Sequence, residues 1–201
     1  MSYRKVSLRE VCDTLSGYTP RGRLEQSPTG GTPAIQLRDL GDGPFDPLSA
    51  PHYDLNNPHR RYLAGAGDLV FRARGDRNTA VLIDLASAAT AVAILPLVIL
   101  RPRRALVDPR YLKWAIDQAP AQRYFDKCAL GTNIRMIPKS ALDDLEIELP
   151  NRPVQELIVE VDALARREYE LTRELAEKRL EMTGLALLSK LQSTGNQNDV
   201  R

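Results

Sequence analysis

The chain contains few of the residues from which metal sites and disulfide scaffolds are built. Only Cys12 and Cys128 occur among 201 residues, with no CxxC pair, and the two histidines, His52 and His59, share a loop rich in proline and asparagine. Structural zinc sites need a set of closely spaced cysteine or histidine ligands, and disulfide-rich domains need many cysteines. We therefore expect no metal site and no disulfide framework.

Long apolar runs are also missing. The most apolar stretch, residues 90–100, is short and contains Pro96, and no secretory leader precedes the first polar residues. A membrane-spanning helix needs about 20 consecutive apolar residues. We therefore expect a cytoplasmic protein with no membrane partner. Hydrophobic residues still make up 43% of the chain, which is enough for the core of one domain.

Sequence patterns that mark catalytic sites are equally scarce. Residues 65–67, Gly-Ala-Gly, lack the further glycine and the following helix of a phosphate-binding loop, and no nucleophile elbow occurs. Cysteines at apolar positions and loop histidines do not suggest a nucleophile with its base. The acidic pairs Asp143/Asp144 and Asp76/Asp84 leave a metal-dependent nuclease open, although a turn and strand edges explain them more simply. We predict no catalytic residue and no cofactor in this chain.

Charge is distributed unevenly along the chain. The net charge is +2, but residues 1–142 carry 20 lysines and arginines against 13 acids, whereas residues 143–201 carry 8 against 13. Arginine outnumbers lysine by 22 to 6, and its planar fork matches phosphates and the guanine edge with paired hydrogen bonds. This composition favours a nucleic-acid partner for the N-terminal part, although a GC-rich genome would also enrich arginine.

Residues Pro153 to Leu191 have the pattern of one uninterrupted helix with an apolar seam. Apolar residues recur on a three-then-four spacing, as in coiled coils, with Glu168 and Lys178 as polar breaks. At about 1.5 Å per residue, such a helix spans roughly 58 Å, more than a domain of this size needs for its own core. We predict that the seam packs against another helix; the alternative is a helix folded back on its own domain. The predicted seam consists of Leu157, Val161, Leu164, Leu171, Leu175, Met182 and Leu185.

The preceding residues predict a small mixed domain with a β core, so the fold class is α+β. Residues 68–74 and 79–84 are expected to form a hairpin, the apolar run 91–100 completes the core, and Asp108-Pro109 begins a helix. We predict a domain over 1–150, the long helix over 151–192 and a disordered tail over 193–201. Other expected elements are a strand and helical turn over 6–15, a strand over 34–37, a helix resumed after Pro120 to about 127, a turn over 140–143 and a strand over 145–149.

Polar and basic side chains gather in the loops of this domain. Arg72, Arg74 and Arg77 alternate along a strand into its turn, so two of them can share a face suited to a DNA groove. Any one such residue is more simply a solvated charge, but together, on loops of a basic domain, they favour contacts with phosphates and base edges. The predicted DNA-binding residues are Tyr18, Thr19, Arg21, Arg23, Gln36, Arg38, Arg72, Arg74, Arg77, Asn78, Asn133, Arg135 and Lys139.

Four segments, in the same order, resemble the specificity subunits of type I restriction-modification enzymes. Residues 6–20 resemble the start of a target recognition domain, residues 65–75 its strand and glycine, and residues 131–142 its closing loop. Residues 145–159 resemble the strand, proline and glutamine that begin the conserved helix, except that Val154 stands where the family tends to have an acidic residue. The usual subunit contains two recognition domains and two helices. This sequence has one of each and no internal repeat, so it resembles half a subunit.

The resemblance implies a non-catalytic subunit that recognises double-stranded DNA. It implies methyltransferase subunits as partners, with S-adenosylmethionine bound to them, and in some systems an ATP-dependent restriction nuclease. Two copies of this chain are expected to pair through their long helices as an antiparallel homodimer and to recognise a two-part, palindromic site. The length of the helix then sets the gap between half-sites. The alternative from another class is an interaction scaffold that recruits a partner through its helix and never contacts DNA.

Overall fold

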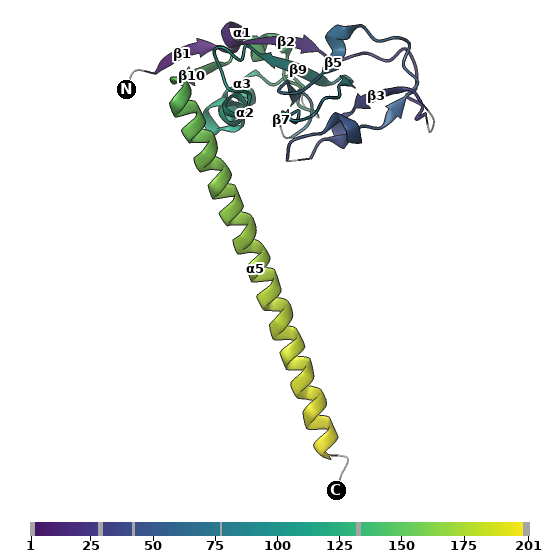
Figure 1. The fold of residues 1–201 in the computed structure, drawn as a ribbon, viewed down its shortest axis with the longest axis vertical. Helices are drawn as coiled ribbons and strands as arrows, with labels where there is room; N and C mark the ends of the chain where they lie inside the picture. The colour runs from purple at the N-terminus through teal and green to yellow at the C-terminus, as the bar shows by residue number, and fades with distance from the viewer. Residues whose placement is uncertain (1–2, 28–29, 42, 77, 132–133, 199–201) are drawn as a thin grey trace. The chain divides into compact units, whose positions relative to one another are not determined.

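The structure is a computed structural model that describes residues 3–27, 30–41, 43–76, 78–131 and 134–198, with side chains described to residue 190. The chain divides into two compact units, Met1–Leu157 and Ile158–Arg201. The first unit contains the sheets and short helices, and the second consists of the long helix beyond its first turns (Figure 1). The first unit therefore ends seven residues beyond the boundary predicted at 150, for the reason given below.

One antiparallel sheet has the strand order β2 (Cys12–Ser16), β9 (Leu97–Pro102), β6 (Leu69–Arg72) and β7 (Ala80–Leu82). The predicted hairpin is confirmed, with Val70 opposite Val81 on β6 and β7. Both strands are buried along their whole length. The helix α2 (Pro109–Asp117) begins as predicted, since the side chain of Asp108 accepts a hydrogen bond from Arg110 N. At the other end of α2, Asp117 accepts from Ala80 N at 3.1 Å and ties the helix to β7.

A second sheet has the order β4 (His52–Tyr53), β3 (Thr32–Ile35), β8 (Ala91–Ala93) and β5 (Leu63–Ala64), with β3 and β8 parallel. The apolar run 91–100 completes the core as predicted, but as two strands in different sheets. Proline has no amide hydrogen, so the ladder is interrupted at Pro96, and Leu97 N instead closes a turn on Ile94 O at 3.0 Å. Side chains of both sheets, such as Ile35 and Ile99, share one buried core.

The start of the chain lies beside the end of the domain. The strand β1 (Arg4–Ser7) pairs antiparallel with β10 (Glu146–Leu149), which places Val6 opposite Ile147. The short helix α1 (Leu8–Val11) follows β1, as the pattern over 6–15 predicted. The remaining helices of the unit are α3 (Ala119–Cys128), α4 (Lys139–Asp144) and the 3-10 turns η1 (Leu37–Asp39), η2 (Pro47–Ser49) and η3 (Arg60–Tyr62).

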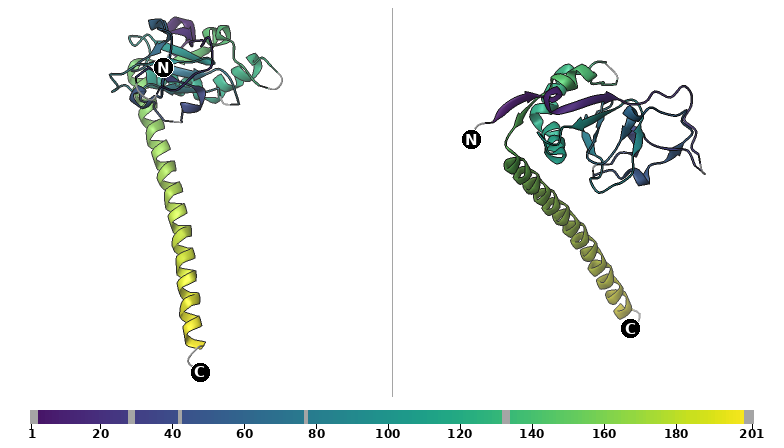
Figure 2. Two further views of the ribbon diagram at one scale, coloured as in Figure 1. Left: turned by 90° about the vertical axis from the view of Figure 1, so that its right-hand side faces the viewer. Right: turned by 45° about the horizontal axis from the view of Figure 1, so that its top comes forward.

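The long helix α5 spans Arg152–Asn198 and is continuous in every view (Figure 2). It extends six residues beyond the end predicted at 192, so residues 193–198 are helical where a disordered tail was expected. Their composition is polar, but polar residues only weaken a helix, and the one glycine among residues 193–198, Gly195, costs about 1 kcal/mol rather than ending the helix. No helix in the described part of the chain is long and apolar enough to cross a membrane.

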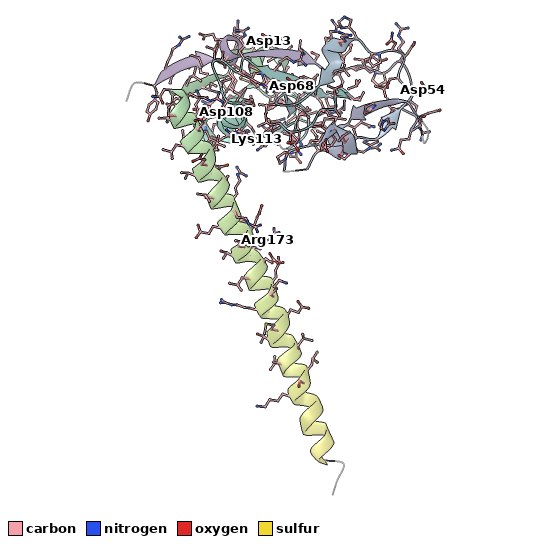
Figure 3. All side chains as sticks on the ribbon, viewed as in Figure 1. Asp13, Asp54, Asp68, Asp108, Lys113 and Arg173 are labelled. Carbon is pink, nitrogen blue, oxygen red and sulfur yellow. The ribbon has the colours of Figure 1, made fainter. Side chains whose placement is uncertain are left out.

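The first turn of α5 is anchored inside the first unit by a buried glutamine. Gln155 is 1% exposed; its Oε1 accepts from Asp108 N at 2.8 Å, and its Nε2 donates to Pro150 O at 2.8 Å. Arg152 adds an ion pair with Asp108, Nη2 to Oδ2, at 3.0 Å. Figure 3 shows Asp108 beside this first turn. These contacts explain why the first unit extends into the helix.

Candidate nucleic-acid interface

Two of the predicted DNA-binding residues lie inside the fold. Arg72 is 9% exposed, and its guanidinium donates to Thr79 Oγ1 at 3.0 Å, Leu40 O at 2.8 Å and Gly41 O at 2.6 Å. Asn78 is 2% exposed and donates to Arg72 O at 3.0 Å. Because β6 is buried along its whole length, Arg72 at its end also points inward, where it fastens the loop around residue 40. These placements argue against both residues as DNA contacts.

The fold brings the turn after β6 beside the loop before α4. Gly75 N donates to Arg135 O at 3.0 Å, and Arg74 forms an isolated antiparallel bridge with Met136. Arg135 and Lys139, however, are paired with the carboxylates of Asp126 and Asp143, respectively. Arg74 is exposed and has no such pair among the described residues. Arg77 and Asn133 were also predicted as contacts, but they lie outside the described residues.

The remaining predicted contacts gather around the second sheet. Gly17 brings Tyr18 against it: Tyr18 N donates to Ala93 O at 2.8 Å, and a Cβ on Gly17 would lie 2.7 Å from Leu97 O. The ring of Tyr18 meets the ring of Tyr62 edge to face, with centroids 5.3 Å apart. Thr19, Arg21 and Arg23 continue from this point as exposed residues.

Two arginines on this sheet are held by tyrosines. Arg38 Nη2 donates to the hydroxyl of Tyr53 at 3.1 Å, and Tyr53 is 1% exposed. Arg61 Nη2 donates to the hydroxyl of Tyr62, and its Cζ lies 4.7 Å from the centre of the same ring. Tyr18, Tyr53 and Tyr62 all pack into one apolar cluster beneath the sheet. We call Tyr18, Arg38, Tyr53, Arg61 and Tyr62 the tyrosine-arginine surface.

A tyrosine hydroxyl orients a guanidinium without cancelling its charge. Arg101, by contrast, forms a salt bridge with Asp68 at 2.9 Å, and Arg103 forms one with Asp13 at 2.8 Å. Arg38 has a carboxylate only at 3.8 Å, on Asp39, while its side chain remains 67% exposed. The hydrogen bond to Tyr53 raises the pKa of Arg38, so the side chain is charged throughout the accessible pH range. The surface therefore keeps positive charge in fixed positions, the property needed to bind a polyanion.

Several residues of this surface are absent from the sequence-based prediction. Arg61, Tyr53 and Tyr62 were missed, as was Arg60 beside them, although the run Arg60-Arg61-Tyr62 is a visible signal of basic residues beside an aromatic ring. Their relation to Tyr18 and Arg38 depends on the order of strands in the sheet. Gln36, which was predicted, lies at the end of β3, and its Nε2 is buried without a hydrogen-bond partner in the described structure. It is therefore an unsatisfied buried donor and is not exposed for a contact with DNA.

Three of the four acids considered for a nuclease are engaged in the fold, while Asp76 is exposed in the turn after β6. Burial tends to raise the pKa of Asp143, but hydrogen bonds from Thr14 and Lys139 outweigh it, so the pKa is lowered and the group is a carboxylate. Asp144 pairs with Arg9, and Asp84 accepts from Ala86 N at 3.0 Å in a turn. Within the residues that the structure describes, no three His, Cys, Asp or Glu side chains form a group that could hold a metal ion.

Cys12 lacks the properties of a nucleophile. Burial raises the pKa of its thiol to about 12. The thiolate is the reactive form of cysteine. Cys12 is therefore protonated near neutral pH and acts as a small core residue, as its place among buried apolar side chains indicates.

Comparison with known proteins found similarity only in three dimensions. No protein-family model matches, and no curated protein matches. Twelve chains of solved structures are similar, and three of them illustrate the match. The HsdS subunit from Thermoanaerobacter tengcongensis has a TM-score of 0.61 at 24% identity and covers 85% of this chain and 39% of its own. A chain from a study of assembly and conformational transition of the type I R-M system has a TM-score of 0.66 at 23% identity, covering 91% and 43%. The type I restriction-modification S subunit from M. genitalium has a TM-score of 0.55 at 16% identity, covering 85% and 40%.

The chain spans about two fifths of the length of these structures. The 91% coverage exceeds the share of the chain that lies in residues 1–157, so that match extends into α5. The resemblance that the sequence motifs predicted is thus confirmed at the level of the fold. This chain has the fold of one target recognition domain and the helix that follows it in a type I restriction-modification S subunit.

Proposed function

We propose that this chain is the DNA-recognition subunit of a type I restriction-modification complex and works as a homodimer on a site in two parts. It performs no chemistry itself. Methyl transfer belongs to methyltransferase subunits that carry S-adenosylmethionine, and an ATP-dependent nuclease subunit joins in systems that also restrict. The complex acts on double-stranded DNA in the cytoplasm.

The observation that carries this proposal is the tyrosine-arginine surface. Exposed arginines at positions 21, 23, 38, 60 and 61 lie in the segments of one sheet and its flanking loops, and none has a carboxylate within 3.5 Å among the described residues. Elsewhere in the domain, arginines 9, 101, 103, 110, 135 and 152 are paired with acids. Arg74, beside the loop before α4, is also unpaired among the described residues, but the second sheet and its loops hold five such cations together. A cluster of cations without acidic partners is suited to bind a polyanion.

The exposed seam of α5 supports pairing of two copies. Its seven residues are between 47% and 70% exposed. Burying one such side chain contributes about 1.5–3 kcal/mol, so a paired helix gains far more than a solitary one. Ion pairs within the helix, such as Arg173 with Glu177 at 3.6 Å, occupy its flanks (Figure 3 shows Arg173 projecting from α5). In an antiparallel pair, the twofold axis places two recognition domains on two half-sites.

Selection of bound sequences from random DNA duplexes tests the proposal. The full chain, with and without the methyltransferase subunit of the same system, should enrich one two-part motif. Arg21→Ala with Arg23→Ala should weaken binding. Arg103→Ala, which removes a cation already paired with Asp13, should not. Salt-sensitive binding without any sequence preference would sink the proposal.

The interaction scaffold remains the second candidate because the exposed seam is equally suited to recruiting a partner helix. Only the DNA-recognition function requires the arginines of the tyrosine-arginine surface. A scaffold with Arg38→Ala and Arg61→Ala retains its activity in a methylation or recruitment assay, whereas a DNA-recognition subunit loses it.

A further inference from the structure

The arginines of the candidate interface differ in how firmly they are oriented. Arg21, Arg23 and Arg60 are exposed, with no hydrogen bond from their guanidinium groups to the described residues. Arg38 and Arg61 are each fixed by a tyrosine hydroxyl. A loose arginine is sufficient to contact a phosphate, because the backbone presents phosphates at every step. A base edge has a single productive direction of approach, so a fixed guanidinium is suited to it.

We infer that Arg38 and Arg61 recognise guanine bases in the major groove and determine two positions of the target sequence. This inference rests on the proposed DNA-recognition function and refines it. Guanine is the base that offers two acceptors, N7 and O6, to the paired N–H groups of arginine. Arg38 uses Nη2 for Tyr53, while its Nη1 makes no hydrogen bond in the described part of the chain. Arg38 therefore keeps N–H donors for the paired hydrogen bonds to a guanine.

The tyrosines act as positioning residues. Tyr53 is buried in β4, where it lies opposite Thr32 of β3. Tyr62 is wedged against Tyr18, whose backbone bridges to Ile94. Both tyrosine rings are thus held by packing, so their hydroxyls occupy fixed positions and binding DNA costs little further ordering of either arginine.

The backbones of the two tyrosines lie at opposite edges of one sheet. Tyr53 belongs to β4, and Tyr62 immediately precedes β5, in the order β4-β3-β8-β5. Three strand spacings amount to about 14 Å. That is about four base pairs, at roughly 3.4 Å each. Both contacts therefore fit within one half-site, and we expect the motif to contain two separate guanine positions.

Base preference at each motif position, measured by selection from random duplexes, tests the inference. Arg38→Lys and Arg61→Lys retain the charge but lose the fork, so each should reduce guanine preference at one position, roughly tenfold or more, with the rest of the motif unchanged. Arg60→Lys is the matched control, since Arg60 neighbours Arg61 but has no tyrosine partner; its motif should equal that of the wild type. Tyr62→Phe should weaken the same position as Arg61→Lys without lowering the melting temperature.

Three results would overturn the inference while leaving DNA recognition intact: a motif without guanine, lysine variants that keep the wild-type motif, or lysine variants that bind every sequence more weakly to the same degree. The last pattern is typical of phosphate contacts. A wild-type chain that enriches no motif would instead overturn the proposed function itself. Arg38 is 67% exposed, so its substitution leaves the fold available for the measurement.

Discussion

Replacing Gln155 by leucine removes the polar centre of the joint between the domain and α5 while nearly preserving side-chain volume. Gln155 is 1% exposed. The substitution leaves Asp108 N without its acceptor at 2.8 Å and Pro150 O without its donor at 2.8 Å. The third bond, to Leu106 O at 3.3 Å, is long and weak. A buried backbone group left without a partner costs about 1–3 kcal/mol.

Two such groups together cost about 2–6 kcal/mol. Greater burial of apolar surface by leucine offsets about 1 kcal/mol or more. We therefore expect the free energy of unfolding to fall by about 1–5 kcal/mol, which is a large part of the roughly 5–15 kcal/mol typical of a domain. With a urea slope of about 2 kcal/mol per molar, the unfolding midpoint should fall by roughly 0.5–2.5 M.

Fluorescence of the single tryptophan is the appropriate assay. Trp114 lies in α2, with its ring 5.5 Å from that of Tyr111, so it reports unfolding of the domain rather than of the helix. Gln26→Leu, the same change at an exposed glutamine, is the control and should leave the midpoint unchanged. Equal midpoints for Gln155→Leu and wild type would show that the buried amide contributes nothing to the joint, and the reasoning would be refuted.

Three further predictions follow from the same contacts. Arg72→Ala should lower the free energy of unfolding by about 2–4 kcal/mol, because three acceptors lose a buried donor. Arg74→Ala should leave the free energy of unfolding unchanged and affect only DNA binding. Urea titrations compare the two variants, and equal stabilities would contradict the assignment of Arg72 to the core. Burial tends to raise the pKa of Asp108, but the hydrogen bonds and charges of Arg110 and Arg152 lower it overall. The stability that Asp108 contributes is therefore present above the carboxyl's unfolded pKa, about 4, and is lost as the pH falls through the lower folded pKa. Asp108→Asn should make the melting temperature depend less on pH between about pH 5 and pH 2, and an unchanged pH profile would count against this ion-pair network. Leu164→Glu with Leu175→Glu should convert a dimer to a monomer in sedimentation, while Leu180→Glu, outside the seam and 76% exposed, should not; a wild-type chain already monomeric at high concentration would reject homodimer pairing.

Local elements were accessible to prediction wherever the signal is short in range. The helix α5, the β6–β7 hairpin and the Asp108 cap depend on residues within a few positions of one another. The same reasoning failed at the run 91–100, where the two halves join different sheets. It also missed that α5 continues to Asn198. Composition alone does not determine which sheet a strand joins or at which residue a helix ends.

The candidate site shows the same division more sharply. The surplus of arginine in residues 1–142 was visible without a structure, but its arginines looked equivalent. The fold separates them: Arg72 is buried among carbonyl groups, Arg135 is paired with Asp126, and Arg61 is oriented by Tyr62. Which side of a strand faces the core determined the first case, and contacts between distant segments determined the relation of Arg61 and Tyr62 to Tyr18.

By itself, then, the sequence determined a basic α+β domain joined to a long helix with an apolar seam, because charge, hydrophobic periodicity and caps are properties of neighbouring residues. Only the tertiary structure decided which cations are neutralised and which remain free on the sheet β4-β3-β8-β5. An ion pair or a tyrosine-held guanidinium requires partners that strand pairing brings together from far along the chain, and that pairing minimises the free energy of the whole domain rather than of any segment.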